Sequence, residues 1–294
     1  MKTDNLPKVA VLLAAYNGMQ WIEEQVDSIL NQQGVTVTLF FSVDLSTDGT
    51  EHWVQKLAEK YSNLVMLPYG ERFGGAGPNF FRLVRDVDFT GFDAVSFADQ
   101  DDIWFSDKLQ GACTLLQARQ CDVYSSNVTA FWPDGKQLLI DKAQPQKKFD
   151  YFFEAAGPGC TYVFNAASAS AFKRFVIELD DQLQAVSLHD WLAYAFCRHN
   201  GFTWFIDPKP SMFYRHHGGN QVGTNTGFTA YKKRFQLILD KWYRQQVLGI
   251  VGLIAPHLKP DFKSHLFLLM NFQAFRRRSR DRWFLLAMIL TRVF

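Results

Sequence analysis

The sequence predicts an α/β protein in which a doubly wound parallel sheet is followed by a helical extension. Three observations favour this fold class: short apolar runs typical of strands buried on both faces, segments with apolar residues at helical spacing between them, and polar turn residues at the junctions. Strands and helices alternate in this way over roughly the first hundred residues, which is the pattern of a doubly wound sheet.

The first strand is the apolar run Val9–Ala14, and the polar turn that closes it leads into a helix that ends before Gly34. The elements that follow in the first part of the chain are the strand Val37–Val43, a helix that contains Trp53 and Leu57, the short strand Val65–Leu67, a helix that opens with Asn79–Val84, and the strand Ala94–Ala98.

Beyond Leu116 the pattern changes to strand-like pieces separated by long loops. These pieces are Val123–Phe131, Cys160–Phe164 and Phe202–Ile206. We expect this half to shape a site more than to build a sheet. From Phe228 onward the chain again shows helical spacing. We therefore divide it into a first domain, residues 1–225, and a C-terminal helical extension that is basic and aromatic, residues 226–294.

The composition excludes several classes of protein. With 294 residues, of which 48% are hydrophobic and 20% charged, the chain is neither disordered nor of low complexity. A net charge of +2 is too balanced for a protein that binds a nucleic-acid backbone. The four scattered cysteines indicate reduced thiols, and no apolar run reaches the roughly 18 residues of a membrane-spanning helix. We expect a cytoplasmic protein without a signal peptide.

Polar side chains follow the predicted strands at the edge where α/β sheets bind ligands. They are Tyr16 and Asn17 after the first strand, Asp44 after the second, and Asp99 to Asp102 after the fourth. Asp99 and Asp101 are two apart in an extended segment, so both carboxylates can reach one hard cation that bridges a diphosphate. Alternatively, Asp101 or Asp102 caps the next helix, although Ser106 is better placed for that cap.

Three segments together resemble the successive motifs of family 2 glycosyltransferases. They are Val9–Gly18, Asp44–Thr50 and Asp99–Leu109, and their order and spacing match as well as their residues. The similarity spans roughly residues 7–220. It implies the GT-A fold, with a nucleotide-binding half and an acceptor half, a nucleoside-diphosphate sugar as donor, a Mg or Mn ion as cofactor, and transfer of a hexosyl group with inversion at the anomeric carbon.

The resemblance also implies roles for single residues on the donor side. The residues that it assigns to the nucleotide are Ala14, Tyr16, Asn17, Asp44 and Asp99. Asp44 resembles the carboxylate that accepts from the base, Asp99 the acid on the ribose or phosphate side, and Asp101 the direct metal ligand. Where many members have two adjacent acids, this chain has only Asp44, so the identity of the base stays open.

Asp190, in the segment Leu188–Trp191, resembles the general base of inverting transfer. Such a base is needed because the acceptor hydroxyl loses a proton as it attacks. The alternative is a carboxylate that stabilises a helix N-terminus, and one residue can do both. On the acceptor side we expect Gly159, Trp191 and Trp104. A small residue such as Gly159 lets a sugar approach the backbone, and a merely structural turn explains it equally well.

The segment Tyr214–Asn220 is a basic, Gly-rich loop that resembles a segment of rhamnosyltransferase-like members of the family. His216 or His217 could ligate the metal or donate to a phosphate, and Arg215 could offset the charge that develops on the leaving group. The sequence does not choose between the two histidines. The alternative is a surface turn with solvated side chains.

These observations favour a metal-dependent inverting glycosyltransferase that acts on a hydroxyl of a surface polysaccharide or lipopolysaccharide. The donor would be dTDP- or UDP-linked, and the resemblance favours rhamnose from dTDP-rhamnose. The second hypothesis is a nucleotidyltransferase, but Tyr16–Gln20 is not the basic, Gly-rich triphosphate loop that such an enzyme would need. A catalytically silent, membrane-associated scaffold is the third, and the presence of Asp44, Asp99, Asp101 and Asp190 argues against it.

The C-terminal extension is basic and apolar. From Lys259 to Phe294 eight basic residues stand against two acidic ones, a difference of +6. Helices of this composition suit an anionic headgroup layer at the inner face of a membrane, where a lipid-linked acceptor would be found. The alternative is a helix pair packed on the catalytic domain or on a second subunit. On the membrane hypothesis, a chain that ends near Pro260 should stay soluble and keep donor hydrolysis.

Overall fold

A seven-stranded sheet with the order β10-β6-β9-β4-β1-β2-β3 forms the centre of the molecule. The structure, a computed structural model, describes residues 6–217 and 241–294. Its first elements are β1 (Lys8–Ala15), α1 (Ile22–Leu30), β2 (Thr36–Val43), α2 (Thr50–Lys60), β3 (Leu64–Met66), α3 (Ala76–Asp86) and β4 (Ala94–Ala98). The strands β1 to β4 are parallel, so the predicted alternation of strands and helices is confirmed.

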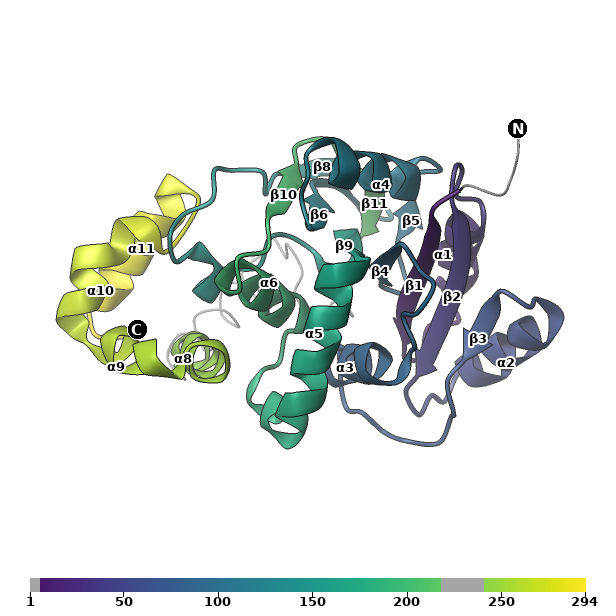
Figure 1. Ribbon diagram of the computed structural model, residues 1–294, viewed down its shortest axis with the longest axis horizontal. Coiled ribbons are helices and arrows are strands. Elements are labelled where there is room, and N and C mark those ends of the chain that lie inside the picture. The colour runs from purple at the N-terminus through teal and green to yellow at the C-terminus, as the bar shows by residue number, and fades with distance from the viewer. Residues whose placement is uncertain (1–5, 218–240) are drawn as a thin grey trace.

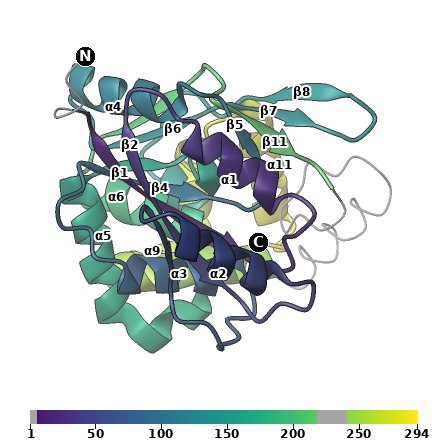
Figure 2. The same cartoon turned by 90° about the vertical axis from the view of Figure 1, so that its right-hand side faces the viewer.

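The central chain segment continues both the sheet and the helical layers. Its elements are β5 (Ile103–Trp104), α4 (Lys108–Ala118), β6 (Val123–Ser126), β7 (Val128–Phe131), β8 (Gln137–Ile140), β9 (Val163–Asn165), α5 (Ala166–Leu179), α6 (His189–His199), β10 (Trp204–Asp207) and β11 (Met212–Arg215). A smaller sheet has the order β5-β11-β7-β8. Figure 2 shows its β7–β8 hairpin at the side of the molecule.

Side chains of β1 alternate between two hydrophobic cores, one on each face of the sheet. Leu12 belongs to the core that contains Phe80 of α3 and Phe172 of α5. Val11 belongs to the other core, with Ile29 of α1. All of these side chains are buried, which explains why the strand is a continuous apolar run. In Figure 2, α3 and α5 lie on the opposite side of the sheet from α4.

The expectation that the second half shapes a site more than it builds a sheet was wrong. The strands β6, β9 and β10 extend the main sheet beyond β4. The piece Val123–Phe131 is not one strand, because the chain leaves the large sheet at Asn127 and enters the small one. Strand β9 pairs antiparallel with both of its neighbours. These strands have three or four residues each, too few for the period of a pattern to identify their sheet.

The C-terminal extension consists of α8 (Trp242–Ile254), α9 (Lys259–Lys263), α10 (His265–Asn271) and α11 (Ser279–Leu290). Figure 1 shows it at the end of the molecule opposite β3 and α2. Phe262, Phe275 and Phe294 are buried there, and all three rings pack on Phe153, which lies outside the extension. The extension therefore shares the core that covers one face of the sheet.

Two arginines of the basic cluster are part of this packing. Arg277 has a fully buried side chain that forms ion pairs with Asp150 at 3.3 Å and Glu154 at 3.6 Å. Arg276 also pairs with Glu154 and donates to the Tyr243 hydroxyl at 2.9 Å. These two cations face protein carboxylates, which corrects the expectation that the whole cluster faces a membrane. Among the described residues no helix is long and apolar enough to span a bilayer.

Candidate active site

The carboxyl ends of β1, β2 and β4 lie at one edge of the sheet. Ala15 is paired with Val43, and Leu13 with Ala98, so the residues that follow these strands meet there. These are the predicted residues Tyr16, Asn17, Asp44 and Asp99. The sequence-based prediction of a site at this edge rests on the parallel order of the strands, which the structure confirms.

The loop after β1 is held by hydrogen bonds to two other loops. The Asn17 side-chain oxygen accepts from the Thr47 N–H at 2.8 Å. Gln100 both accepts from the Tyr16 N–H at 2.8 Å and donates to the Tyr16 carbonyl at 2.9 Å. The Tyr16 side chain is 50% exposed, whereas Ala14 is buried in β1. Tyr16 is thus open to a ligand, and Gln100 is a positioning residue that the sequence reasoning passed over.

Asp44 is buried and its carboxylate is already bonded to backbone. Oδ1 accepts from the N–H groups of Leu45 and Phe73, at 2.8 and 3.0 Å, and Oδ2 accepts from Gly74 at 3.0 Å. Asp44 therefore attaches the loop that contains Gly74 to the end of β2. A contact of this carboxylate with a nucleotide base remains a prediction.

An acidic cluster lies at the end of β4. Ligand atoms of Asp99, Asp102 and Cys160 lie within 4.8 Å of one another. Burial, followed by the charge of Asp101, raises the pKa of Asp99 to about 7, and the same two causes hold the pKa of Asp102 well above its usual range. Within the described part of the chain, the Asp102 Oδ2 atom is buried without a hydrogen-bond partner. Carboxylates arranged in this way are stabilised by a cation.

Lys108 is a buried cation near this cluster. Its ammonium lies 3.1 Å from the centre of the Trp104 ring. Burial lowers the pKa of Lys108 to about 7, and the electrostatic effects of Cys160 and Asp102 act in the opposite direction. Lys108 begins α4, where the Asp107 side chain does not cap the helix, and the Leu109 N–H instead donates to Gln32 Oε1 at 2.9 Å. The expected capping by Ser106, Asp101 or Asp102 is therefore not observed.

The two histidines left open by the sequence occupy different environments. His217 Nε2 lies 2.6 Å from Asp101 Oδ2, and its ring stacks on Trp21 with centroids 3.9 Å apart. His216 is buried and stacks on Trp132, with centroids 4.6 Å apart. The structure thus brings His217, rather than His216, to the predicted metal ligand Asp101. Residues 218–220 of the predicted loop lie outside the described residues.

Arg215 is hydrogen-bonded and ion-paired at the sheet edge that carries the acidic cluster. Its Nε donates to the Asp101 carbonyl at 2.8 Å, its backbone N–H donates to Asp102 at 3.1 Å, and its guanidinium pairs with Glu24. The side chain therefore supports the acidic cluster through the backbone of Asp101. A contact with the leaving group stays a prediction.

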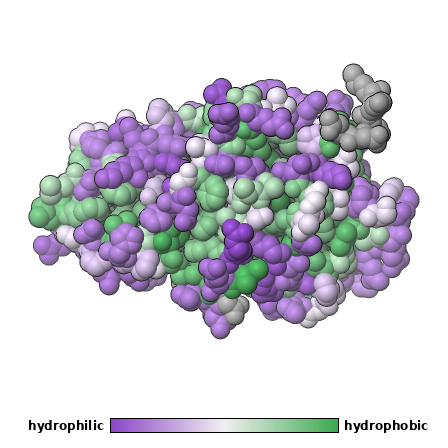
Figure 3. All heavy atoms as spheres, viewed as in Figure 1, coloured by the Kyte–Doolittle hydropathy of each residue, from purple (hydrophilic) through white to green (hydrophobic). Residues whose placement is uncertain are grey.

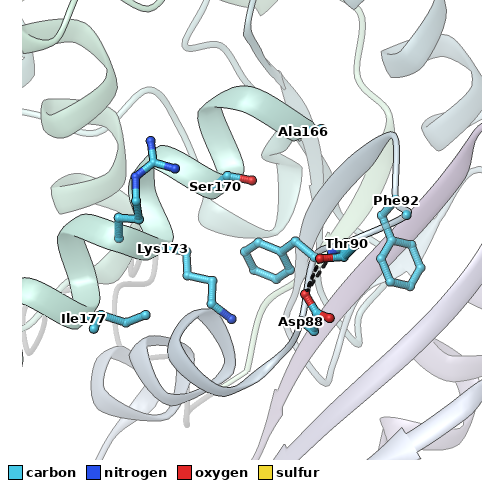
Figure 4. A pocket seen from close by; sticks show the side chains of 10 residues that line it. Asp88, Thr90, Phe92, Ala166, Ser170, Lys173 and Ile177 are labelled. Atoms are coloured by element: carbon cyan, nitrogen blue, oxygen red, sulfur yellow. Dashed lines mark hydrogen bonds between the residues drawn. The ribbon is translucent and has the colours of Figure 1, made fainter.

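A cavity of about 280 Å³ opens beside His217. It is lined by Gln20, Trp21, Phe131, Pro133, Arg215, His216 and His217. A second cavity, of about 350 Å³, lies between the loop before β4 and α5. Figure 4 shows Asp88 and Thr90 of that loop and Lys173 of α5 around it. This loop precedes β4, so the second cavity lies at the opposite edge of the sheet from the acidic cluster.

Asp190 lies in the first turn of α6 and is half-buried. Its Oδ1 accepts from the N–H of Trp191 at 2.7 Å, and burial raises its pKa to about 6. Its charge contributes to the raised pKa of Asp99, which places it within electrostatic reach of the acidic cluster. The helix N-terminus that the sequence offered as an alternative is present as well.

Gly159 fits closely against this carboxylate. A Cβ atom on Gly159 would lie 2.9 Å from Asp190 Cβ and 2.9 Å from His189 Nε2, so no larger residue fits without movement. Trp104 and Trp191, in contrast, are only 3% and 4% exposed, and the Trp191 indole N–H donates to Tyr151 at 3.0 Å. Their burial counts against the predicted contact of either ring with an acceptor.

Comparison with known proteins decides the family. The family model described as glycosyl transferase family 2 matches residues 10–180. The chain belongs to this glycosyltransferase family. The family match favours a glycosyltransferase over the two alternative hypotheses, which were a nucleotidyltransferase and a catalytically silent scaffold.

Relatives in the family extend the match over the whole chain. A protein of Shigella flexneri named dTDP-rhamnosyl transferase RfbG is 43% identical over 289 residues, which are 96% of this chain and all of the relative. A Bacillus subtilis protein, the putative teichuronic acid biosynthesis glycosyltransferase TuaG, is 29% identical over 49% of this chain and 52% of its own.

Solved structures of glycosyltransferases share the fold. Residues 1–349 of S. aureus TarS, solved in complex with UDP-GlcNAc, align with a TM-score of 0.58 and 15% identity, covering 97% of this chain and 80% of that one. The mannosyltransferase PcManGT of Pyrobaculum calidifontis aligns with a TM-score of 0.55 and 16% identity, covering 98% and 74%. The GT-A fold expected of this glycosyltransferase is confirmed.

Proposed function

We propose that the protein is an inverting rhamnosyltransferase that moves rhamnose from dTDP-rhamnose to a hydroxyl of a surface polysaccharide or lipopolysaccharide acceptor. The observation that carries the proposal is the acidic cluster at the sheet edge, with His217 on Asp101 and with Asp190 within electrostatic reach. The donor is supported by the name of the 43% identical relative, which the chain matches over its full length.

The residues that would hold Mg or Mn are Asp99, Asp101 and His217. Carboxylate oxygens suit these hard cations, and an imidazole nitrogen suits Mn better than Mg. The raised pKa of Asp99 fits this assignment, because close, buried carboxylates repel one another in the absence of a cation. When bound, the ion would neutralise the charge of the leaving diphosphate.

Asp190 is the proposed general base. The acceptor oxygen forms a bond to the anomeric carbon while the bond from that carbon to the diphosphate oxygen breaks, and the electron pair leaves with dTDP. Asp190 takes the hydroxyl proton during this attack. With its pKa raised to about 6, it is mostly ionised at pH 7 and is a stronger base than an ordinary aspartate.

The remaining donor-side residues bind the nucleotide in this proposal. Tyr16 offers an exposed ring, Asn17 and Asp44 fix the loops around the nucleotide, and Arg215 supplies positive charge near the diphosphate. Gly159 packs closely against the base Asp190, and in this proposal it keeps the backbone next to the acceptor free of a side chain.

Hydrolysis of nucleotide sugars by the purified full-length chain tests this function. With Mn²⁺ present, we expect dTDP-rhamnose to be hydrolysed faster than UDP-GlcNAc or GDP-mannose. Asp101→Ala should abolish hydrolysis and Mn²⁺-dependent binding of dTDP, because no neutral side chain replaces a carboxylate ligand. The control is Asp107→Ala, since Asp107 is exposed and its ion pair among the described residues is with the exposed Lys209, at 3.2 Å. Preference for another donor refutes the sugar assignment, and unchanged Mn²⁺-dependent binding in Asp101→Ala refutes the metal site.

We further propose that the enzyme works in the cytoplasm at the inner face of the membrane and binds it through α10 and α11. Five large apolar side chains of these helices are at least 58% exposed: Leu266, Met270, Trp283, Phe284 and Leu290. The side chain of Arg280, on α11, is 83% exposed. Figure 3 shows hydrophobic residues at the surface of this end of the molecule. Exposed apolar and cationic side chains together suit an anionic lipid surface.

Flotation with anionic vesicles tests the membrane proposal. The full-length chain should float and be released by high salt, while the double variant Trp283→Ser and Phe284→Ser should stay in solution. The matched control changes Leu138 and Leu139 to Ser, since these exposed side chains lie on β8, far along the chain from α11. Equal flotation of both double variants, or no flotation of the unchanged chain, contradicts the proposal.

A further inference from the structure

Lys142 is a half-buried cation near the proposed base. Among the residues that the structure describes, its backbone N–H is hydrogen-bonded, whereas its ammonium forms no hydrogen bond or ion pair. Its charge nevertheless acts on Asp190, where it lowers the pKa that burial raises. Partial burial of an ammonium group without a hydrogen-bond partner costs free energy of folding unless a nearby opposite charge compensates it.

The backbone fixes Lys142 at the sheet edge that carries the active site. The Lys142 N–H donates to the side-chain oxygen of Asn127 at 2.7 Å. Asn127 directly follows β6, is buried, and also donates to the Pro208 carbonyl at 3.0 Å. Because β6 runs parallel to β4 through their shared antiparallel neighbour β9, Asn127 lies at the same edge as Asp99.

A glycine-containing turn brings Lys142 and Asp190 together. A Cβ atom on Gly157 would lie 3.6 Å from Lys142 Cγ, so the alkyl stem of the lysine rests on this turn. Two residues later, Gly159 contacts Asp190 in the same way. The two side chains therefore pack on positions two residues apart in one short turn, and the charge of Lys142 acts on Asp190.

Other charged groups act on the two side chains. Burial has the largest effect on Lys142 and lowers its pKa to about 8. The charge of Glu154 favours the protonated form of Lys142, whereas the charges of Arg276, Arg277 and Arg278 disfavour it. Asp190 is faced by Lys142 and by the acidic cluster through Asp99. Glu154 and the arginines Arg276 and Arg277 are bonded to one another.

We propose that Lys142 is a positioning residue whose ammonium keeps the Asp190 carboxylate ionised, and thus ready to take the acceptor proton. The inference rests on the proposed role of Asp190 as base. Lys142 does not touch the sugar in this scheme. It acts through Asp190, by opposing the effect of burial on that carboxylate.

The experiment is the pH dependence of dTDP-rhamnose hydrolysis, in which water replaces the acceptor hydroxyl, at saturating donor and Mn²⁺. Lys142→Met keeps the length of the stem and removes the charge. An opposite charge close to a carboxylate shifts its pKa by about one unit or more. We therefore expect the acid limb of kcat to move up by about one pH unit, with about a fivefold loss of rate at pH 6 and little loss at pH 8.

Two further variants separate this role from a structural one. Lys142→Arg should restore the position of the acid limb, because it restores the charge. Lys148→Met should leave the profile unchanged, because Lys148 is exposed on the same chain segment. Binding of dTDP with Mn²⁺ should be equal in all of these proteins, which also reports that each variant is folded.

Two outcomes overturn the inference. One is an acid limb that stays in place in Lys142→Met, and the other is an equal loss of kcat at every pH that Lys142→Arg does not restore. The proposed function fails separately: if Asp190→Asn retains wild-type hydrolysis, Asp190 is not the base, whatever the Lys142 variants do. If Asp190→Asn is inactive but the acid limb does not move in Lys142→Met, the role of Lys142 is rejected and the role of Asp190 stands.

Discussion

Replacement of Arg277 by Met should strongly destabilise the enzyme, because this arginine joins the C-terminal extension to the catalytic domain. Its buried guanidinium pairs with Asp150 and Glu154, and it donates to the Ala155 carbonyl at 2.7 Å. Methionine fills a similar volume, so the change removes mainly charge and hydrogen bonds. Removal of one partner from a buried ion pair costs about 3–5 kcal/mol.

The remaining contacts favour the lower end of this range. Asp150 keeps Arg198 at 3.3 Å and the Tyr194 hydroxyl at 3.0 Å, and Glu154 keeps Arg276 at 3.7 Å. We therefore expect a loss of about 3 kcal/mol in the free energy of unfolding. For a chain of this size such a loss corresponds to a fall in Tm of roughly 5 °C.

Urea unfolding followed by tryptophan fluorescence, together with thermal unfolding, measures this loss. The matched control is Arg280→Met, because Arg280 is 83% exposed and its pair with Asp281 at 3.2 Å is solvated. The control should change stability by no more than about 0.5 kcal/mol. If Arg277→Met is as stable as the control, the buried ion pairs do not hold the extension in place.

The same packing changes the expectation for a shortened chain. A chain that ends near Pro260 lacks Phe262, Phe275 and Phe294, which cover Phe153. Loss of these rings exposes buried apolar surface, so we expect such a chain to be unstable rather than soluble and active. The exposed residues of α10 and α11, and not the whole extension, are therefore the part to vary in membrane experiments.

Two predictions concern the reaction itself. Asp190→Asn should lower kcat by at least about a hundredfold with little change in donor affinity, since a general base contributes about 10²–10⁴ to the rate. Steady-state kinetics with dTDP-rhamnose measures both quantities. A loss of donor binding instead would place Asp190 in the nucleotide site. Gly159→Ala introduces a Cβ 2.9 Å from Asp190 Cβ. Because this displaces the base, kcat should fall by on the order of tenfold while dTDP binding is unchanged. The control is Gly111→Ala, whose Cβ meets no atom within 4 Å, and equal kcat in the two variants would contradict the prediction.

The candidate site could be predicted in part because its residues follow strands. Asp44 and Asp99 stand directly after apolar runs, and the parallel order of the sheet brings such positions to one edge. The roles of Gln100 and Lys142 could not be predicted in this way. Gln100 acts on a backbone 84 residues away, and the side chains of Lys142 and Asp190 pack on the same turn, at Gly157 and Gly159.

The sequence by itself determined the strands β1 to β4, the helices between them, and the polar residues at their ends, since these features depend on the spacing of neighbouring residues. Only the tertiary structure decided that β6, β9 and β10 extend the sheet and that His217, not His216, meets Asp101. It also decided that Arg277 is buried against Asp150, although its sequence neighbours are basic. The physical reason is that such contacts join residues far apart in the chain, and no local period records which partner a short strand or a charged side chain finds.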